Sequence, residues 1–397
     1  MQKDIFVTGI GVISAIGINV DQNFESLKNK NSGLGSIDIL QTKHKAVFKV
    51  GEVKLSNYQL LDILGLPHSE IKKFTRTSLL GLIAAKEAVN NSGIDIANDE
   101  LKTGLISATT VGGMDKTEIE IADPDATTDF LLTHPSGDST NKICEYLGIN
   151  GYRTTISTAC SSSVNAIIHG IRLIRYGILD RAVVGGVDAL SKFTLNGFNS
   201  LMILDKDFCK PFDENRKGLN LGEGAGFLVI ESERSLKKRE KQSFCKISGY
   251  ANANDAYHQT ASSPEGNGAF NAMDTALNMS KLNLLDIDYI NAHGTGTANN
   301  DLSEGVALKR IFGEKMPKFS STKAYTGHTL GAAAAIEAVF SVLSIQHGII
   351  YPNLNFNTAI SEINLTPQTE VEKKEVKNVL SNSFGFGGNN SSIIFSK

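Results

Sequence analysis

Short runs of β-branched and apolar residues alternate along the chain with longer stretches in which apolar residues recur at helical spacing. The short runs predict strands at residues 5–8, 103–107, 181–185, 226–230, 287–292 and 392–395. The longer stretches predict helices at residues 77–92, 161–176, 268–278, 301–312 and 332–346. Strands that alternate with helices in this way indicate an α/β fold.

The same rhythm occurs twice along the 397 residues. No Pro- or Ser-rich linker divides the chain, and the charge-rich segment at 231–242 is the one plausible junction, although taken alone it reads more simply as a solvated helix or loop. A strand-like segment, CKISGYANA, follows it and restarts the pattern. We therefore predict two related halves fused side by side, residues 1–245 and 246–397.

Composition and charge exclude several kinds of function. The formal net charge is −3 with both signs interspersed, whereas a nucleic-acid footprint needs clustered Lys and Arg. The apolar N-terminus carries Asp4 and reads as a buried strand and turn rather than a signal peptide. No stretch approaches the ~20 uninterrupted apolar residues of a membrane span. The cysteines show no paired spacing, which predicts a reduced, cytoplasmic protein: Cys144, Cys160, Cys209 and Cys245.

Cys160 occupies the most informative position in the chain. A β-branched run at 154–158 gives way at Ala159 and Cys160 to a helix with a periodic apolar face. The unpaired N–H groups at a helix start favour a thiolate, as in a nucleophile elbow built with Cys. A buried, inert cysteine fits the position equally well. The other three cysteines lack this setting and are expected to be inert.

Two histidines stand beside glycines at predicted turns. His293 follows the apolar strand DYINA, and Thr295 and Thr297 come next in a Gly-rich turn, with both hydroxyls able to face one side. Lys323 and His328 lie in the segment SSTKAYTGHTLGAAAAIE. They precede a helix of small residues that contains Glu337. A histidine at a helix start is expected to stay neutral. Each histidine alone is more simply structural, but three such residues at strand ends or turns predict a catalytic cluster.

The remaining motifs are weaker. His258 lies in a polar, Gly/Pro-rich segment that reads as a surface loop. GEGAG at 222–226 lacks phosphate-loop spacing and predicts close backbone packing. In NSFGFGGNNSS, N–H groups near Phe384 and Phe386 could face an oxyanion, and a Gly-rich hairpin explains the motif equally well. No metal is predicted, because no His/Cys pair has zinc-ligand spacing, and GxSxG is absent.

Together these motifs resemble a known family. TACSSS, NAHGTGTANND, STKAYTGHTLGAA and NSFGFGGNN, in this order, closely resemble the β-ketoacyl-[acyl-carrier-protein] synthases of the elongating type I/II group. The likeness runs nearly end to end and includes KPFDENRKGLNLGEGAGFLVIE and the loop DAYHQTASSPEGNGA. It implies a thiolase-like fold of duplicated α/β halves in five layers, αβαβα, usually as a homodimer. The first half would carry the nucleophile and the second the two histidines.

The resemblance also implies roles for single residues. Cys160 would accept an acyl chain as a thioester from the phosphopantetheine of an acyl carrier protein, so no resident cofactor is expected. His293 and His328 would bind the malonyl thioester and stabilise the enolate left by decarboxylation, oriented by Lys323 and Glu337. N–H groups of Cys160 and Phe386 would form the oxyanion hole. The expected substrate-binding residues are Thr295 and Thr297 for the pantetheine arm, Val111 and Phe198 for the acyl pocket, and Phe384. Phe386 would be the aromatic gate between the acyl pocket and the entrance.

Other members of the superfamily fit less well. Initiating synthases carry Asn where His328 stands, chain-length-factor subunits lack the cysteine, and thiolases need a second cysteine that nothing after Cys245 supplies. Asn389 replaces the usual Thr after FGFGG, RKGL at 216–219 replaces RDGF, and the segments 119–133 and 202–210 look short. A synthase of a polyene or polyketide pathway, paired with a non-catalytic homologue as a heterodimer, therefore stands as the alternative to fatty-acid synthesis.

Overall fold

The strands and helices found in the structure match the predicted rhythm closely. The structure is a computed structural model that describes residues 4–96, 100–125, 127–128 and 130–397. Its strands are β1 (Ile5–Ser14), β2 (Leu34–Gly35), β3 (Val50–Gly51), β4 (Thr103–Ala108), β5 (Arg153–Ile156), β6 (Arg181–Asp188), β7 (Gly224–Ser232), β8 (Cys245–Asn254), β9 (Tyr289–Asn291), β10 (Lys318–Ser320), β11 (Ile349–Ile350), β12 (Glu372–Lys373), β13 (Asn378–Gly385) and β14 (Asn389–Ser396).

Helices connect most of these strands. They are α1 (Val20–Lys28), α2 (Asn57–Leu64), α3 (Arg76–Ser92), α4 (Met114–Glu120), α5 (Phe130–Thr133), α6 (Gly137–Leu147), α7 (Ser162–Arg175), α8 (Lys192–Ser200), α9 (Glu233–Arg239), α10 (Asn267–Ser280), α11 (Ala298–Phe312), α12 (Lys323–Thr326) and α13 (Ala333–His347). Short 3-10 turns lie at His68–Lys73, Leu284–Asp286, Gly313–Lys315, Leu330–Ala332 and Phe386–Gly388. The segment 119–133, which looks short beside the family pattern, includes positions 126 and 129, and these lie outside the described residues.

The main sheet shows an internal repeat. Its strand order is β10-β9-β13-β14-β8-β1-β7-β6-β4-β5. Read outward from the centre, the first half gives β1-β7-β6-β4-β5 and the second gives β8-β14-β13-β9-β10. The directions repeat as well, since the first three strands of each series pair antiparallel and the last two pairs are parallel. The two series meet where β1 pairs with β8 at two positions only.

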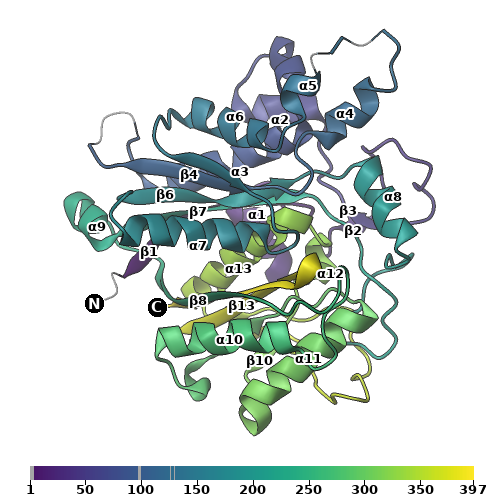
Figure 1. Cartoon of the computed structure of the whole chain (residues 1–397), viewed down its shortest axis with the longest axis vertical. Coiled ribbons are helices and arrows are strands. Elements are labelled where there is room, and N and C mark those ends of the chain that lie inside the picture. Colours follow the sequence, from purple (N-terminus) through teal and green to yellow (C-terminus); the bar gives the residue numbers. More distant parts are fainter. Residues whose placement is uncertain (1–3, 97–99, 126, 129) are drawn as a thin grey trace.

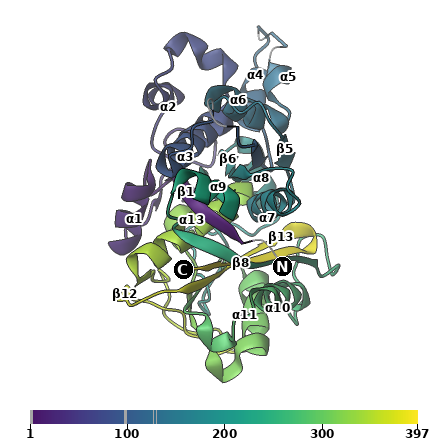
Figure 2. The ribbon, with the colours of Figure 1, turned by 90° about the vertical axis from the view of Figure 1, so that its left-hand side faces the viewer.

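Helices cover the two series of strands in layers, as Figures 1 and 2 show. In the first half α3 packs on the outer face of β1, β7 and β6, and in the second half α10 packs on β8 and β14. Between the two sets of strands lie α7 and α13, which pack against each other. The order is therefore helix, sheet, helix, sheet, helix, which is the five-layered thiolase-like fold that the family resemblance implied.

The central layer explains one exceptional helix. The segment Leu330–His347 is long and apolar enough to cross a membrane by composition, but 89% of it is buried inside the protein. A helix that is apolar on all sides is expected where it has neighbours on all sides, and α13 contacts β7, β13 and α7. The apolar composition of α13 therefore reflects its position between the two series of strands.

Two strands of the main sheet were not predicted from the sequence. The short strand β10 and the long strand β13 were not among the expected strands, and the β13 sequence, NVLSNSFG, interrupts its apolar residues with Ser and Asn. Those polar side chains are buried nonetheless, because Asn382 hydrogen-bonds to Glu304 and to Ser392 within the protein. Buried polar side chains that satisfy one another hide a strand from a hydrophobicity pattern.

Candidate active site

Cys160 lies on a tight turn between β5 and α7. The preceding residue, Ala159, adopts a left-handed conformation with φ of 52°, which is uncommon for a residue with a Cβ. The turn is held by its own side chains, because Ser162 Oγ donates to the Ala159 carbonyl and accepts from the Thr158 N–H. The Cys160 side chain is only 6% exposed. The sequence prediction of a strand-to-helix turn at this cysteine is correct.

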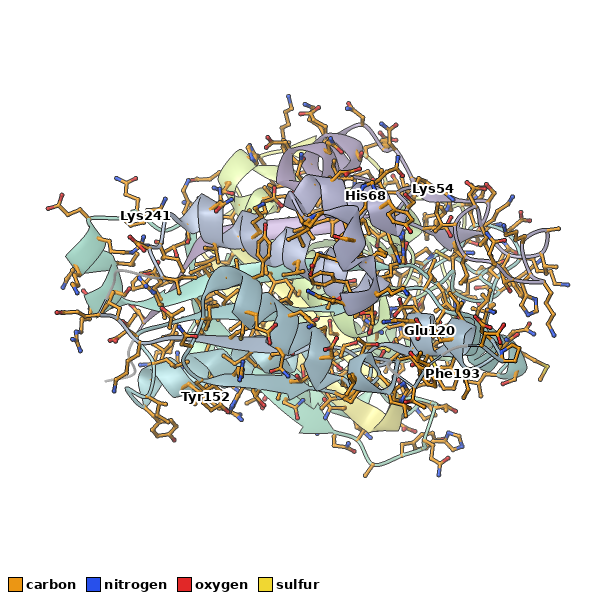
Figure 3. The ribbon with its side chains drawn as sticks, turned by 90° about the horizontal axis from the view of Figure 1, so that it is seen from above. Lys54, His68, Glu120, Tyr152, Phe193 and Lys241 are labelled. Carbon is orange, nitrogen blue, oxygen red and sulfur yellow. The ribbon has the colours of Figure 1, made fainter. Side chains whose placement is uncertain are left out.

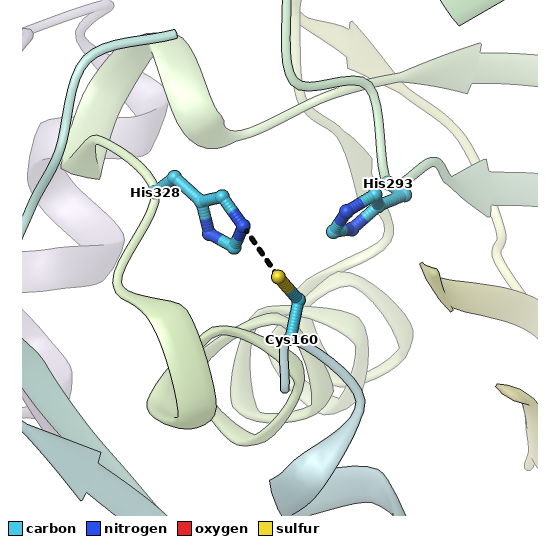
Figure 4. Close-up of side chains that lie close together, drawn as sticks. All are labelled: Cys160, His293 and His328. Carbon is cyan, nitrogen blue, oxygen red and sulfur yellow. Dashed lines mark hydrogen bonds between the residues drawn. The ribbon is translucent and has the colours of Figure 1, made fainter. Parts of the chain in front are cut away.

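His328 faces the sulfur directly. Its Nε2 lies 3.0 Å from Cys160 Sγ, as Figure 4 shows. The backbone of His328 is fixed on both sides, since its N–H donates to the Asn220 carbonyl and its own carbonyl accepts from Gly222. Its other ring nitrogen, Nδ1, accepts from the N–H of Leu330 at 3.3 Å. The turn at Leu330–Ala332 therefore sets the orientation of the ring.

His293 lies on the other side of the sulfur. Its ring is nearly perpendicular to that of His328, with centroids 5.4 Å apart. Lys323 Nζ lies 3.2 Å from His293 Nδ1 and donates to the His293 carbonyl at 2.6 Å. The same ammonium pairs with Glu337 on α13 at 2.5 Å. Lys323 therefore joins the histidine to the central helix through a buried ion pair.

These contacts set the protonation of both imidazoles. In each ring Nδ1 faces an N–H donor, so the single proton of the neutral ring lies on Nε2, which points toward the sulfur in His328. Burial, reinforced by the charge of Lys323, holds the pKa of both histidines well below its usual range. The site therefore presents two neutral N–H donors, and the predicted neutrality of His328 is in line with its surroundings.

The donor set also bears on metal binding. The ligand atoms of Cys160, His293 and His328 lie within 4.8 Å of one another, so the three residues predicted as a catalytic cluster do come together. A metal-bound histidine coordinates through an unprotonated nitrogen and donates its other N–H to an acceptor. Here both Nδ1 atoms face donors instead. This arrangement suits a negatively charged substrate oxygen better than a cation.

The protonation of Cys160 differs from the sequence expectation. Burial raises the pKa of its thiol to about 11, although Lys323 and the N–H groups of Phe386 and Cys160 act in the opposite direction. The prediction of a resting thiolate is therefore wrong, because desolvation outweighs the helix start. The same N–H groups of Cys160 and Phe386 point to the sulfur, where a developing oxyanion would also lie.

A cavity of about 300 Å³ opens onto these residues. Among the predicted site residues its wall includes Cys160, His293, Thr295, Thr297, Phe198, His328, Phe384 and Phe386. The rings of Phe198 and Phe386 stack with centroids 6.0 Å apart. Val111 is not part of this wall; its N–H points toward Asp188 at 3.4 Å.

Buried carboxylates that sequence reasoning missed hold the catalytic loops. Glu304 on α11 accepts the N–H groups of His293 and Gly294 at 2.9 and 2.8 Å. Asp301, on the same helix as Glu304, accepts a hydrogen bond from the N–H of Gly296. Asp188, at the end of β6, accepts the N–H of Gly331 beside the His328 turn. Each of these residues is acidic, and nothing in the local sequence pattern distinguishes it from a surface residue, although burial raises the pKa of all three carboxyls.

The weaker motifs have structural roles. Among the glycines at 222–226, a Cβ on Gly222 would come within 2.1 Å of the Thr326 carbonyl and one on Gly226 within 2.5 Å of the Ile336 nitrogen. The prediction of close backbone packing there is confirmed. His258 is exposed, in line with a surface loop, and its Nδ1 accepts the N–H of Thr260.

The fold and this site define a condensing enzyme of the thiolase-like class. Residues 2–235 match the family described as Beta-ketoacyl synthase, N-terminal domain, and residues 244–357 match Beta-ketoacyl synthase, C-terminal domain. The chain therefore belongs to the β-ketoacyl synthase family of acyltransferases.

Relatives agree with this assignment over the full length. The chain is 34% identical to 3-oxoacyl-[acyl-carrier-protein] synthase 2 of Staphylococcus aureus, across 100% of this chain and 98% of that one. It is 33% identical to a putative mitochondrial 3-oxoacyl-[acyl-carrier-protein] synthase of Schizosaccharomyces pombe, across 100% and 99%.

Solved structures of the same fold include assemblies with partner subunits. The ishigamide ketosynthase/chain length factor matches with a TM-score of 0.92 and 28% identity over the whole of both chains. A ketosynthase in complex with its chain length factor from Xenorhabdus doucetiae matches with a TM-score of 0.86 and 31% identity, covering 99% of this chain and 98% of that one.

Proposed function

We propose that the protein catalyses the decarboxylative condensation of malonyl-acyl-carrier protein with an acyl chain held on Cys160, giving 3-oxoacyl-acyl-carrier protein in cytoplasmic fatty-acid synthesis. The observation that carries this proposal is the cluster of Cys160, His293 and His328, with both imidazoles neutral and one in contact with the sulfur. The relatives named 3-oxoacyl-[acyl-carrier-protein] synthase support it.

The first step transfers the acyl chain. Cys160 sulfur attacks the acyl thioester carbonyl, a new C–S bond forms, and the bond to the pantetheine sulfur breaks. The thiol proton of Cys160 leaves with the pantetheine thiolate as its thiol, so charge is balanced. Negative charge develops on the carbonyl oxygen, and the N–H groups of Cys160 and Phe386 are placed to stabilise it.

The second step makes the carbon–carbon bond. Malonyl thioester loses carbon dioxide, and the electrons of the broken bond form an enolate whose oxygen accepts hydrogen bonds from His293 and His328. Neutral donors favour the charged enolate over the neutral carbonyl, so they lower the barrier rather than bind the ground state. The enolate carbon then attacks the acyl thioester, the C–S bond to Cys160 breaks, and the sulfur takes up a proton.

Replacements of the three catalytic residues test this mechanism. Cys160→Ala should abolish both acyl-enzyme formation, seen by intact-mass spectrometry, and condensation. His293→Ala or His328→Ala should slow release of carbon dioxide from malonyl-carrier protein by about a hundredfold or more, since each removes a transition-state contact. Condensation at the normal rate by the Cys160→Ala protein would refute the proposal.

A second candidate is a ketosynthase of a polyene or polyketide pathway that pairs with a non-catalytic homologue. It is favoured by the match over the whole chain to the ishigamide ketosynthase/chain length factor. A panel of acyl-carrier proteins distinguishes the two, because the acyl group retained on Cys160 after mixing gives its length and unsaturation directly by mass.

Lysines beside the cavity are the candidate contacts for the acyl carrier protein. Lys217 lines the cavity, and Lys206 lies on the same segment, 201–219, with an exposed side chain. Lys206→Glu with Lys217→Glu should raise KM for carrier-bound substrates and leave KM for small pantetheine thioesters unchanged, since only the former meets this surface. Lys281→Glu, at the end of α10, is the control.

A further inference from the structure

Asn389 follows the Gly-rich turn that carries Phe386, at a position where the sequence departs from the related synthases. It is the first residue of β14, directly after the turn Phe386–Gly388. Its side-chain oxygen lies 2.7 Å from Ser161 Oγ and 2.9 Å from Asn165 Nδ2. Ser161 is the neighbour of Cys160, and Asn165 lies one turn further along α7. The asparagine therefore bridges the turn of one half to the nucleophile helix of the other.

The bridge belongs to a closed polar cluster. Asn252 on β8 donates to the same Asn389 oxygen at 2.7 Å and to Asn165 Oδ1 at 3.0 Å. Ser391 on β14 also donates to Asn165 Oδ1, at 3.1 Å. Asn165 Nδ2 contacts Thr158 Oγ1 at 2.8 Å. Donors from Ser161 and Asn165, at the start of α7, and from Asn252 on β8 thus converge on the Asn389 side-chain oxygen. Together they fix the position of this oxygen more strongly than a single contact would.

The opposite side of the turn is held separately. Gly387 donates its N–H to the Gln259 carbonyl at 2.7 Å and accepts from Asn254 Nδ2 at 2.9 Å. These contacts tie the turn to the loop after β8, which belongs to the same half of the protein. Among the side-chain hydrogen bonds of residues 386–389, those of Asn389 alone reach α7.

The location gives this bridge a mechanistic meaning. One N–H that faces the sulfur belongs to Cys160 on the α7 side, and the other belongs to Phe386 on the turn. The two come from different halves of the protein, so their separation depends on what joins the turn to the helix. We infer that Asn389 is a positioning residue that holds the Phe386 N–H in register with Cys160 and so assembles the oxyanion hole.

The inference rests on the proposed function, and the two steps of that reaction separate it from a merely structural role. Acyl transfer to Cys160 uses the oxyanion hole, whereas malonyl decarboxylation uses His293 and His328, which the Asn389 cluster does not contact. Asn389→Leu has nearly the same shape but leaves the converging donors without an acceptor. It should slow acylation of Cys160 by about tenfold or more, with malonyl decarboxylation within about twofold of the original rate.

Matched variants complete the experiment. Asn389→Asp keeps an acceptor oxygen in the same place and should acylate within about threefold of the original rate. Asn90→Leu, at an exposed site on α3, should change neither step. Ser161→Ala removes one donor, and combined with Asn389→Leu it should slow acylation less than the product of the single effects, because both act on one contact.

The outcomes are distinct. Acylation by Asn389→Leu at the original rate, or equal loss of acylation and decarboxylation, would overturn the positioning role. If Asn389→Leu does not fold, judged by its unfolding transition, the same comparison is made with Asn165→Leu, which removes another member of the bridge. Failure of the unaltered protein to acylate Cys160 would instead overturn the proposed function.

Discussion

At Cys160 two effects compete for the proton. Burial favours the neutral thiol and dominates, so the pKa is raised to about 11, while Lys323 and two backbone N–H groups favour the thiolate. The resting enzyme therefore keeps a neutral sulfur next to two neutral imidazoles. Charge appears only when substrate enters, where the same N–H groups can stabilise it.

The raised pKa predicts the alkylation profile of Cys160. Only the thiolate reacts with iodoacetamide, so the rate should rise about tenfold per pH unit from pH 7 to 10 with no plateau in that range. Peptide mass spectrometry after short exposures measures it. A plateau near pH 7 would show a thiolate at rest and contradict the assignment.

The other cysteines provide an internal control. Burial raises the pKa of Cys144 to about 11 and that of Cys209 to about 12, and it also raises the pKa of Cys245. Cys160 lines the cavity and the other three do not. Cys160 should therefore be labelled first at every pH, and equal labelling of all four would show that access to the sulfur does not decide reactivity.

The histidines predict a second pH profile. Burial and the charge of Lys323 hold both pKa values well below the usual range, so both rings stay neutral where an exposed histidine would gain a proton. Malonyl decarboxylation should therefore vary by less than about twofold between pH 6 and 8, where a solvent-exposed histidine would titrate. Measurement of carbon dioxide release across this range tests it; a fall on the acidic side would mean that one ring gains a proton.

At the scale of elements, a buried ion pair joins α3 to the segment before β7. Arg76 Nη2 lies 2.6 Å from Glu223 Oε1 and Arg76 Nε lies 2.9 Å from Oε2, with both side chains almost fully buried. The guanidinium also donates to the carbonyls of Val53 and Leu55. Glu223 immediately follows Gly222, which anchors His328, so this pair supports the backbone beneath the active site.

Breaking this pair should destabilise the protein strongly. Arg76→Met leaves the Glu223 carboxylate buried without its partner and should lower the free energy of unfolding by about 3–5 kcal/mol, measured with denaturant. Lys237→Met, which breaks the exposed pair with Glu233 on α9, is the control and should cost less than about 1 kcal/mol. If the two variants lost similar free energy of unfolding, the buried ion pair would contribute no more to stability than the exposed one.

The elements also show how far the sequence alone leads. Cys160, His293 and His328 each end a strand or begin a helix, and local patterns marked all three. Their approach to within 4.8 Å depends on how the two halves pack, which no local pattern contains. The repeated rhythm predicted two related α/β halves, because periodicity reports which faces are buried, whereas the five layers came from the family resemblance.

Other parts of the site have no such local signal. Glu304 lies next to His293 in space but 11 positions along the chain, and Asp188 contacts Gly331 across 143 positions. Charged residues in a sequence indicate solvent by default, so their burial follows only from the assembled fold. The protonation of Cys160 was mispredicted for the same reason, since the depth of burial was unknown.

At the scale of the whole molecule, one flank has an edge strand with exposed apolar side chains nearby. Among the described residues β5 ends the main sheet and pairs with β4 alone, so no strand lies along its other edge. Exposed apolar side chains gather on α4, α5 and α8 nearby, and Figure 3 shows Phe193 beside Glu120 at the end of α4. They are Ile119, Ile121, Leu131, Leu132 and Phe193, with exposures from 55% to 76%. Open sheet edges and apolar patches of this kind are usually covered by a partner.

We propose that this flank forms the interface of a dimer. A second copy related by a twofold axis would pair its β5 with this one and cover the apolar side chains of both. Light scattering should then give the mass of two chains. Ile121→Glu with Leu132→Glu should give the mass of one, because each interface would bury four unpaired carboxylates. Leu285→Glu, an equally exposed site in the second half, should leave the dimer intact. A single-chain mass for the unaltered protein that doubles only when a non-catalytic homologue is added would show that the partner is a homologue rather than a second copy.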